Sequence, residues 1–127
     1  MIDYATGGDL LEAYGTAWEA FDGDAWVAIF TDDAEYHGDP FRAPLVGHNA
    51  LRAAMLEAAE TQRDIDFTVE RHWVSGSTVL AAWHASWTRR VDGAAVRVAG
   101  FLAADVASDD RISRLHEWRI AVPAPPG

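Results

Sequence analysis

Two carboxylates in this sequence are candidates for acid–base chemistry, and the first of them is Asp39. Pro40 follows it directly, and a proline holds the preceding residue in extended backbone and donates no hydrogen bond to a sheet. One interpretation is that Asp39 opens a turn at the end of a strand and caps local N–H groups. The other is that Phe41 shields Asp39 from water, which disfavours the charged form and makes the carboxylate a stronger base.

The second candidate is Glu117, in the stretch ISRLHEWRIAV at residues 112–122. Side chains two residues apart in a strand point to the same side, so Glu117 shares a face with Leu115 and is predicted to point inward. There it is either a second acid–base group or the partner of an inward arginine, Arg71 or Arg119.

Two more polar residues are candidates for the same chemistry. His37, two residues before Asp39, is either a proton carrier at the mouth of a pocket or a solvated histidine. Tyr14 lies on the apolar stripe of the first predicted helix and is a candidate hydrogen-bond donor.

Large apolar side chains are candidates for the wall of a ligand pocket, because such pockets are mostly apolar. Plain core packing explains the same residues equally well. The candidate binding residues are Trp18, Phe41, Trp83, Trp87 and Leu102.

Composition excludes several classes of function. The chain has 127 residues, half of them hydrophobic, which indicates one globular domain. It has no cysteine and all ten of its basic residues are arginine, which excludes thiolate and lysine Schiff-base chemistry. A net charge of −10 argues against a nucleic-acid partner. The five histidines lack metal-ligand spacing and no glycine-rich phosphate loop is present, so no metal and no cofactor are expected.

The predicted elements are three helices followed by a four-stranded antiparallel meander, an α+β layout. Apolar residues at three- and four-residue spacing run from Leu10 to Phe21, a second helix carries Trp26 and Phe30, and a third begins near Asn49. The predicted strands are 64–75, 78–91, 94–107 and 112–122, with Asp92-Gly93 as a type I′ hairpin turn.

Alternation within the strands predicts which residues lie under the helices. The inward set is Val79, Ala81, Trp83, Ala85, Trp87, Val96, Val98, Gly100 and Leu102. Gly100 is expected where the sheet bends or where a side chain from the helices approaches its backbone. Leu80, Phe101, Ile112 and Trp118 form an outward apolar patch that predicts a homodimer.

The chain is expected to form one domain over residues 1–122, with a flexible proline-rich tail at 123–127. The N-terminal stretch has acidic residues where a signal peptide needs positive charge, and no apolar run reaches membrane-spanning length. A cytoplasmic protein with no membrane partner is therefore expected.

Several weak motifs occur in a characteristic order: Gly23-Asp24, Asp32-Asp33-Ala34, Asp39-Pro40-Phe41, and Ile112 with Glu117-Trp118. Together they resemble the SnoaL-like branch of the nuclear transport factor 2 superfamily over about residues 8–120. The resemblance implies a curved sheet around three helices, which form a cone with an apolar cavity. Relatives include ketosteroid isomerases, polyketide cyclases, limonene epoxide hydrolases and members that only bind or dimerise.

The resemblance places Asp39 at the position of the isomerase base and Glu117 at the final acid of the hydrolases and cyclases. The residues that assist these acids in relatives are replaced here. Thr16 and Leu102 stand at the isomerase oxyanion hole, Trp83 and Ala85 at the hydrolase Arg-x-Asp, and Leu115 at the cyclase histidine. Oxyanion-hole donors supply about 3–4 kcal/mol each in the best cases, so steroid isomerisation is not expected.

Two functions follow from these residues. In the first, the protein binds a small apolar, cyclic molecule and Asp39 removes a proton next to a carbonyl or activates water, with Glu117 as second acid–base group. In the second, it is a non-catalytic ligand-binding or dimerisation module whose tryptophans fill the cavity.

Overall fold

The computed structural model describes residues 1–123 of the chain. Its elements in chain order are α1 (Tyr4–Glu19), α2 (Gly23–Ala28), β1 (Phe30–His37), β2 (Leu45–Val46), α3 (His48–Thr61), β3 (Gln62–Ser75), β4 (Thr78–Arg89), β5 (Ala95–Val106) and β6 (Ile112–Pro123). Pro123 therefore belongs to a strand, and the rest of the predicted tail lies outside the described residues. Within residues 1–123 no helix is long and apolar enough to cross a membrane.

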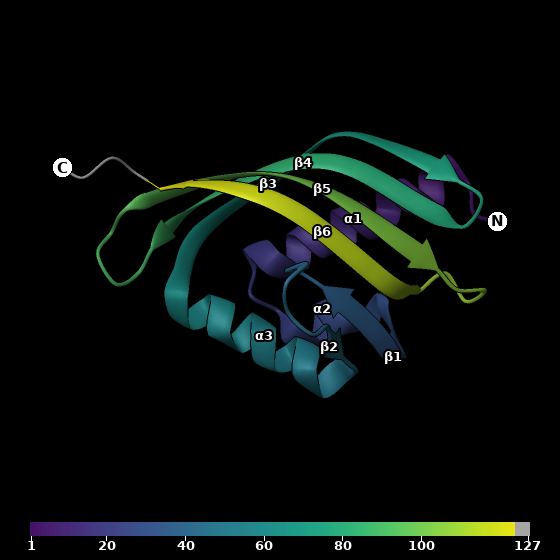
Figure 1. Ribbon diagram of the computed structural model, residues 1–127, viewed down its shortest axis with the longest axis horizontal. Coiled ribbons are helices and arrows are strands. Elements are labelled where there is room, and N and C mark those ends of the chain that lie inside the picture. The colour runs from purple at the N-terminus through teal and green to yellow at the C-terminus, as the bar shows by residue number, and fades with distance from the viewer. Residues whose placement is uncertain (124–127) are drawn as a thin grey trace.

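The six strands form one sheet in the order β2-β1-β6-β5-β4-β3. Neighbouring strands are antiparallel except β1 and β6, which run parallel. Figure 1 shows the long strands as a curved layer, with the helices on its inner side. The predicted α+β class and the four-stranded meander, now β3 to β6, are confirmed. The second helix is shorter than predicted, because Phe30 already begins β1.

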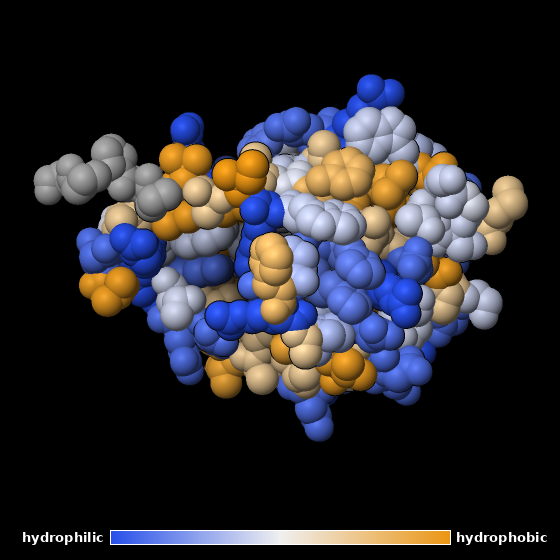
Figure 2. Space-filling view, viewed as in Figure 1, coloured by the Kyte–Doolittle hydropathy of each residue, from blue (hydrophilic) through white to orange (hydrophobic). Residues whose placement is uncertain are grey.

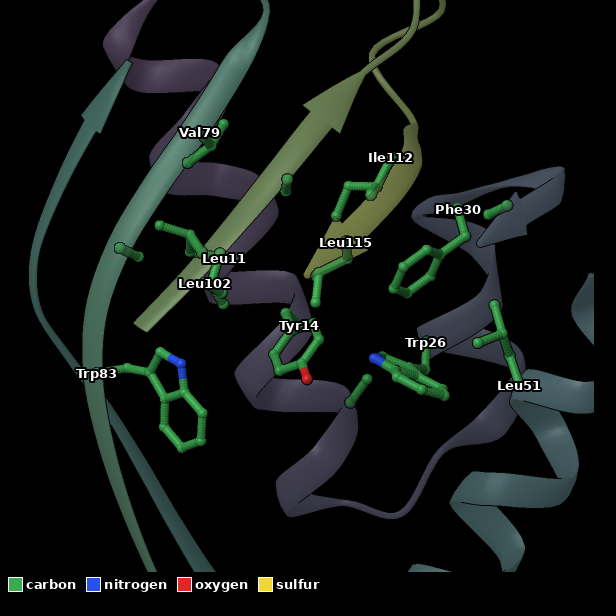
Figure 3. Packing of buried hydrophobic residues seen from close by; sticks show 14 of the residues in the cluster. Leu11, Tyr14, Trp26, Phe30, Leu51, Val79, Trp83, Leu102, Ile112 and Leu115 are labelled. Atoms are coloured by element: carbon green, nitrogen blue, oxygen red, sulfur yellow. The ribbon is translucent and has the colours of Figure 1, made fainter. Parts of the chain in front are cut away.

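The inner face of the sheet carries the core, as the alternation predicted. Val79, Ala81, Trp83 and Ala85 on β4 and Val96, Val98 and Leu102 on β5 are buried, whereas Trp87 is partly buried near the end of β4. They form one cluster with Leu11, Tyr14 and Ala17 of α1. Figure 3 shows Leu11 and Tyr14 among the side chains that project from the strands.

Gly100 on β5 stands directly opposite Trp83 on β4. A Cβ at this position would lie 2.9 Å from Trp83 Nε1 and closer still to Cε2 and Cζ2 of the same ring. The indole therefore lies flat against the glycine backbone. The predicted close approach is confirmed, but the approaching side chain comes from the neighbouring strand and not from a helix.

Two local predictions were wrong. The predicted type I′ turn between β4 and β5 is instead a longer loop, in which Arg89 N donates to Ala94 O at 2.8 Å. Only Gly93 has a positive φ in this loop, whereas a type I′ turn requires two such residues.

Ile112 is buried, although it was predicted to point outward. The reason is that the pairing of β6 with β5 shifts by one residue between Ile112 and Arg114, which leaves Ser113 as an extra residue. Such a bulge reverses the alternation of side chains along a strand.

Candidate functional site

A cavity of about 270 Å³, here called the inner cavity, lies between α3 and the inner face of the sheet. Aromatic side chains from four elements form part of its wall, and it contains one buried carboxylate. The residues that carry the argument below are Tyr14, Trp18, Trp26, Tyr36, Trp83 and Glu117. They come from five different elements, α1, α2, β1, β4 and β6.

Glu117 is held from both sides by tyrosine hydroxyl groups. Tyr14 donates to Glu117 Oε1 and Tyr36 donates to Oε2, each at 2.6 Å. The helix α1 supplies Tyr14 from its apolar stripe, and β1 supplies Tyr36 because it runs beside β6, with Tyr36 paired with Leu115. Tyr14 is 103 residues and Tyr36 is 81 residues from Glu117 in the sequence, so three distant segments meet at one carboxylate.

The geometry of this tyrosine–glutamate–tyrosine cluster indicates a carboxylate that accepts two strong hydrogen bonds. Both distances lie within the range of about 2.5–2.7 Å typical of a hydroxyl bonded to an ionised acid. Burial and then the neighbouring Glu117 raise the pKa of Tyr14 and of Tyr36 well above the ordinary value of 10.0. The tyrosines therefore remain protonated donors at neutral pH.

The Glu117 carboxylate can accept further hydrogen bonds from a ligand. Each of its oxygens has two acceptor positions, and each uses one for a tyrosine. Glu117 is only 3% exposed, so its carboxylate has little contact with bulk water. The cluster is able to take up and return one proton beside a cavity that is lined in part by aromatic rings.

Comparison with known proteins places the chain in a family. A family model of the SnoaL-like domain matches residues 11–115. The chain belongs to the SnoaL-like family. No curated protein matches the sequence of the chain.

Solved structures share the fold of this SnoaL-like protein at low sequence identity. SalBIII, an epoxide hydrolase/cyclase-like enzyme in pyran ring formation in the polyether salinomycin, has a TM-score of 0.83 at 17% identity over 94% of this chain and 95% of that chain. A protein with a ketosteroid isomerase-like fold from Catenulispora acidiphila, in complex with trimethylamine, has 0.79 at 13% identity over 87% and 84%. A computationally designed 17-OHP binder has 0.78 at 17% over 92% and 98%.

Asp39 of this SnoaL-like protein acts as a turn cap. Its Oδ1 accepts from Phe41 N at 2.9 Å, its Oδ2 lies 3.6 Å from Arg42 Nε, and its side chain is 48% exposed. It borders a second depression, which also reaches Glu117, but it does not line the inner cavity. This corrects the expectation of a desolvated base turned toward the cavity, because the carboxylate is solvated and engaged with its own loop.

Other predicted site residues also lie outside the inner cavity. Phe41 is 95% exposed, so it does not cover the site. His37 stacks on His116 with ring centres 4.1 Å apart and contacts Glu35 Oε1 at 3.1 Å. Leu102 is fully buried in the core, and Trp87 packs against Trp18. Of the predicted set, Glu117, Tyr14, Trp18 and Trp83 line the inner cavity.

The alternative role of Glu117, an ion pair with an arginine, is not seen among the described residues. Neither Arg71 nor Arg119 forms an ion pair with it within the part of the chain that the structure describes. Arg71 lies over the ring of Trp73, 4.9 Å from its centre, and Arg119 is an exposed residue of the cavity wall. Among residues 1–123 no group of three or more histidine, aspartate and glutamate side chains is arranged to hold a metal ion.

Two residues of the site were missed by sequence reasoning. Tyr36 has the signal of strand alternation, since it shares a face with the buried Ala34. Trp26 lies on a helix of only six residues, where apolar periodicity is too short to assign a face.

Proposed function

We propose that this SnoaL-like protein binds a small, largely apolar, cyclic molecule in the inner cavity, and that Glu117 exchanges a proton with it. The observation that carries the proposal is the buried carboxylate held by two tyrosines in an aromatic wall. A buried ionisable group with specific partners in a cavity is a common sign of a functional site.

The volume of the inner cavity limits the size of the ligand. At about 270 Å³ it falls just below the range of about 300–1,000 Å³ usual for ligand pockets. This favours a molecule of one or two rings over one of steroid size. Tryptophan rings on three elements favour a flat shape.

The proposed chemistry is general acid–base catalysis. Glu117 removes a proton from carbon next to a carbonyl group, or from a water or hydroxyl group, and returns it at another position. Tyr14 and Tyr36 hold the carboxylate in place and exclude bulk water from it. The fold shared with SalBIII and with a designed small-molecule binder is consistent with either catalysis or binding in this cavity.

A second candidate function is ligand binding without catalysis. The two tyrosine hydrogen bonds favour this alternative in one respect, because they tie α1, β1 and β6 together and give Glu117 a purely structural use. Hydrogen bonds to a carboxylate also stabilise its charged form and so weaken it as a base.

The test is proton exchange in deuterated buffer on a set of one- and two-ring ketones that includes 2-tetralone, followed by NMR. We expect wild-type protein to accelerate exchange of the protons next to the carbonyl. Glu117→Gln keeps the size of the side chain and should lower the rate by about 10²–10⁴-fold, the usual contribution of a general base. Asp39→Asn is the matched control and should retain the wild-type rate, because its carboxylate caps a turn.

The outcomes separate the two functions. A Glu117→Gln variant that melts cooperatively and exchanges as fast as wild type would exclude Glu117 as the base. Binding of the ketones without any exchange above the buffer rate would establish the non-catalytic alternative.

A further inference from the structure

The parallel pairing of β1 with β6 brings two histidines together on the outer side of the sheet. His37 and His116 stand opposite each other in the register, and their rings stack with centres 4.1 Å apart at an angle of 12°. Trp118 continues the stack, with its ring centre 5.7 Å from that of His116. Both histidines are partly buried, and the proposed function does not use them.

The same two strands carry the hydrogen bond between Tyr36 and Glu117 on their inner side. Tyr36 precedes His37 and Glu117 follows His116, and neighbouring residues of a strand point to opposite faces. The β1–β6 pairing is therefore closed by a histidine stack on one face and by a tyrosine–carboxylate hydrogen bond of 2.6 Å on the other. A change in the stack reaches the candidate site through one residue of backbone on each strand.

The β1–β6 pairing is short and irregular. Its register is interrupted between Phe30 and Glu35 and resumes over residues 35–37, the end of β1. By contrast, β5 pairs with β6 from Val96 to Val106, with one shift near the end. Beyond β1 the described sheet ends in β2, a strand of two residues. Local opening favours segments that few main-chain hydrogen bonds hold, so the end of β1 is a place where this sheet opens easily.

Charged groups around the stack determine how it responds to protons. His37 Nε2 lies 3.1 Å from Glu35 Oε1, and Arg114 donates to the other oxygen of Glu35 at 3.4 Å. These two hydrogen bonds lower the pKa of Glu35, which stays charged and can pair with a protonated His37. Burial lowers the pKa of His116, and the positive groups of His37 and Arg114 lower it further. Asp105 and Glu35 act in the opposite direction but do not offset these effects.

A second proton on the histidine pair is therefore unfavourable while the strands are closed. Two imidazolium rings with centres 4.1 Å apart would repel each other, and separation into water relieves this repulsion. The closed pair thus binds a proton at His116 less tightly than the opened strands do. The stability that the pairing gains is complete above about pH 6.5, the ordinary value for histidine, and decreases as the pH falls below it.

We propose that the His37–His116 stack is a pH-sensitive contact that holds the end of β1 on β6, and that acidification opens it and releases Tyr36 from Glu117. Glu117 then keeps the hydrogen bond from Tyr14, and the wall of the inner cavity loses one of its aromatic rings. The opening is a property of the fold and takes place with or without a ligand. Its effect on the acid–base chemistry of Glu117 rests on the proposed function.

The test measures amide hydrogen exchange by NMR on the full chain between pH 5.5 and 8, with rates corrected for the intrinsic effect of pH. We expect the opening equilibrium of residues 35–37 to rise by up to about tenfold for each pH unit below about 6.5, the limit for an opening that takes up one proton. Amides at the centre of the β4–β5 pairing should exchange much more slowly at every pH, because β1 opens locally. Over the same range the hydroxyl proton signal of Tyr36 should broaden, while that of Tyr14 persists.

His116→Phe removes the titrating group but keeps a flat ring against His37. In this variant the opening equilibrium of residues 35–37 should no longer rise as the pH falls. His84→Phe is the matched control, because His84 also contacts a glutamate, Glu70 at 2.9 Å, but is 51% exposed on β4. It should keep the pH dependence of the wild type.

The titration of the histidines by NMR tests the repulsion directly. His37→Phe keeps the stacked ring and removes the neighbouring charge, so His116 should titrate at a higher pH than in wild type. The titration of His84 should be unchanged. A stack with a purely structural role would leave the titration of His116 where it is.

Five results would overturn the proposal. The first two are an opening of residues 35–37 that is constant across the pH range, and an unchanged pH dependence in His116→Phe. The third is exchange of these amides at the rate of the β4–β5 amides, which would indicate global unfolding. The fourth is a response that depends on protein concentration, which would indicate self-association. The fifth is a sharp Tyr36 hydroxyl signal at pH 5.5. None of these measurements involves a ketone, so failure of Glu117 as a base would leave the pH response intact.

Discussion

Substitution of Gly100 by alanine tests the contact that sets the position of Trp83. The added Cβ would lie 2.9 Å from Trp83 Nε1 and nearer to two carbons of the ring. Trp83 is buried, so its rigid indole cannot move aside without disturbing the core. Overpacking of this kind costs about 1–3 kcal/mol. For a domain of this size the melting temperature should fall by roughly 3–15 °C.

The origin of the loss is established by a double-mutant cycle with Trp83→Phe, measured by urea unfolding and thermal melting. The smaller ring leaves room for the new methyl group, so Gly100→Ala should cost about 1 kcal/mol less in the Trp83→Phe background. Gly76→Ala is the control. Gly76 has a positive φ of 63° but open space around its Cβ position, so its cost should be the same in both backgrounds.

Two results would refute this reasoning. The first is an unchanged melting temperature in Gly100→Ala. The second is additive free energies for Gly100→Ala and Trp83→Phe, which would show that the two residues do not compete for the same space.

Two further predictions concern the tyrosines and the outer face of the sheet. The pKa values of Tyr14 and Tyr36 are raised in the folded state, so the folded protein binds their protons more tightly than the unfolded chain does. The stability that these protons contribute is present below pH 10 and should be lost as the pH rises above it. The free energy of unfolding, measured with a chemical denaturant between pH 8 and about 11, should fall less steeply with pH in Tyr14→Phe than in wild type. Equal slopes against pH would contradict the prediction. We also propose a homodimer through the exposed residues Phe101, Trp118, Ile120 and Val122, over the strands where Figure 2 shows orange residues. Sedimentation at micromolar concentration should give a dimer for wild type and a monomer for Trp118→Glu; a wild-type monomer would refute it.

Much of the fold follows from local pattern in the sequence. The predicted strand 78–91 corresponds to Thr78–Arg89, and the predicted strand 94–107 to Ala95–Val106. The inward positions on both were correct, because strand alternation is a property of neighbouring residues and needs no knowledge of the partner strand. The inward direction of Glu117 followed from the same rule.

The local sequence pattern did not decide the role of Asp39. The motif Asp39-Pro40-Phe41 suits both a turn and a shielded base, and residue types alone do not distinguish these two. The choice depends on where the loop sits relative to the sheet. In the folded chain the carboxylate bonds to the backbone N–H of Phe41 and stays in solvent.

The candidate site itself was decided by tertiary structure. Glu117 meets Tyr36 because β1 runs parallel to β6, and meets Tyr14 because α1 crosses the same face of the sheet. The wall of the inner cavity has the same origin, since Trp83 lies against Gly100 of the neighbouring strand and Trp26 packs against Tyr14 and Tyr36. Residue types and strand alternation determine which side chains point inward. Which of those side chains touch depends on pairings between distant segments, and only the folded chain makes these.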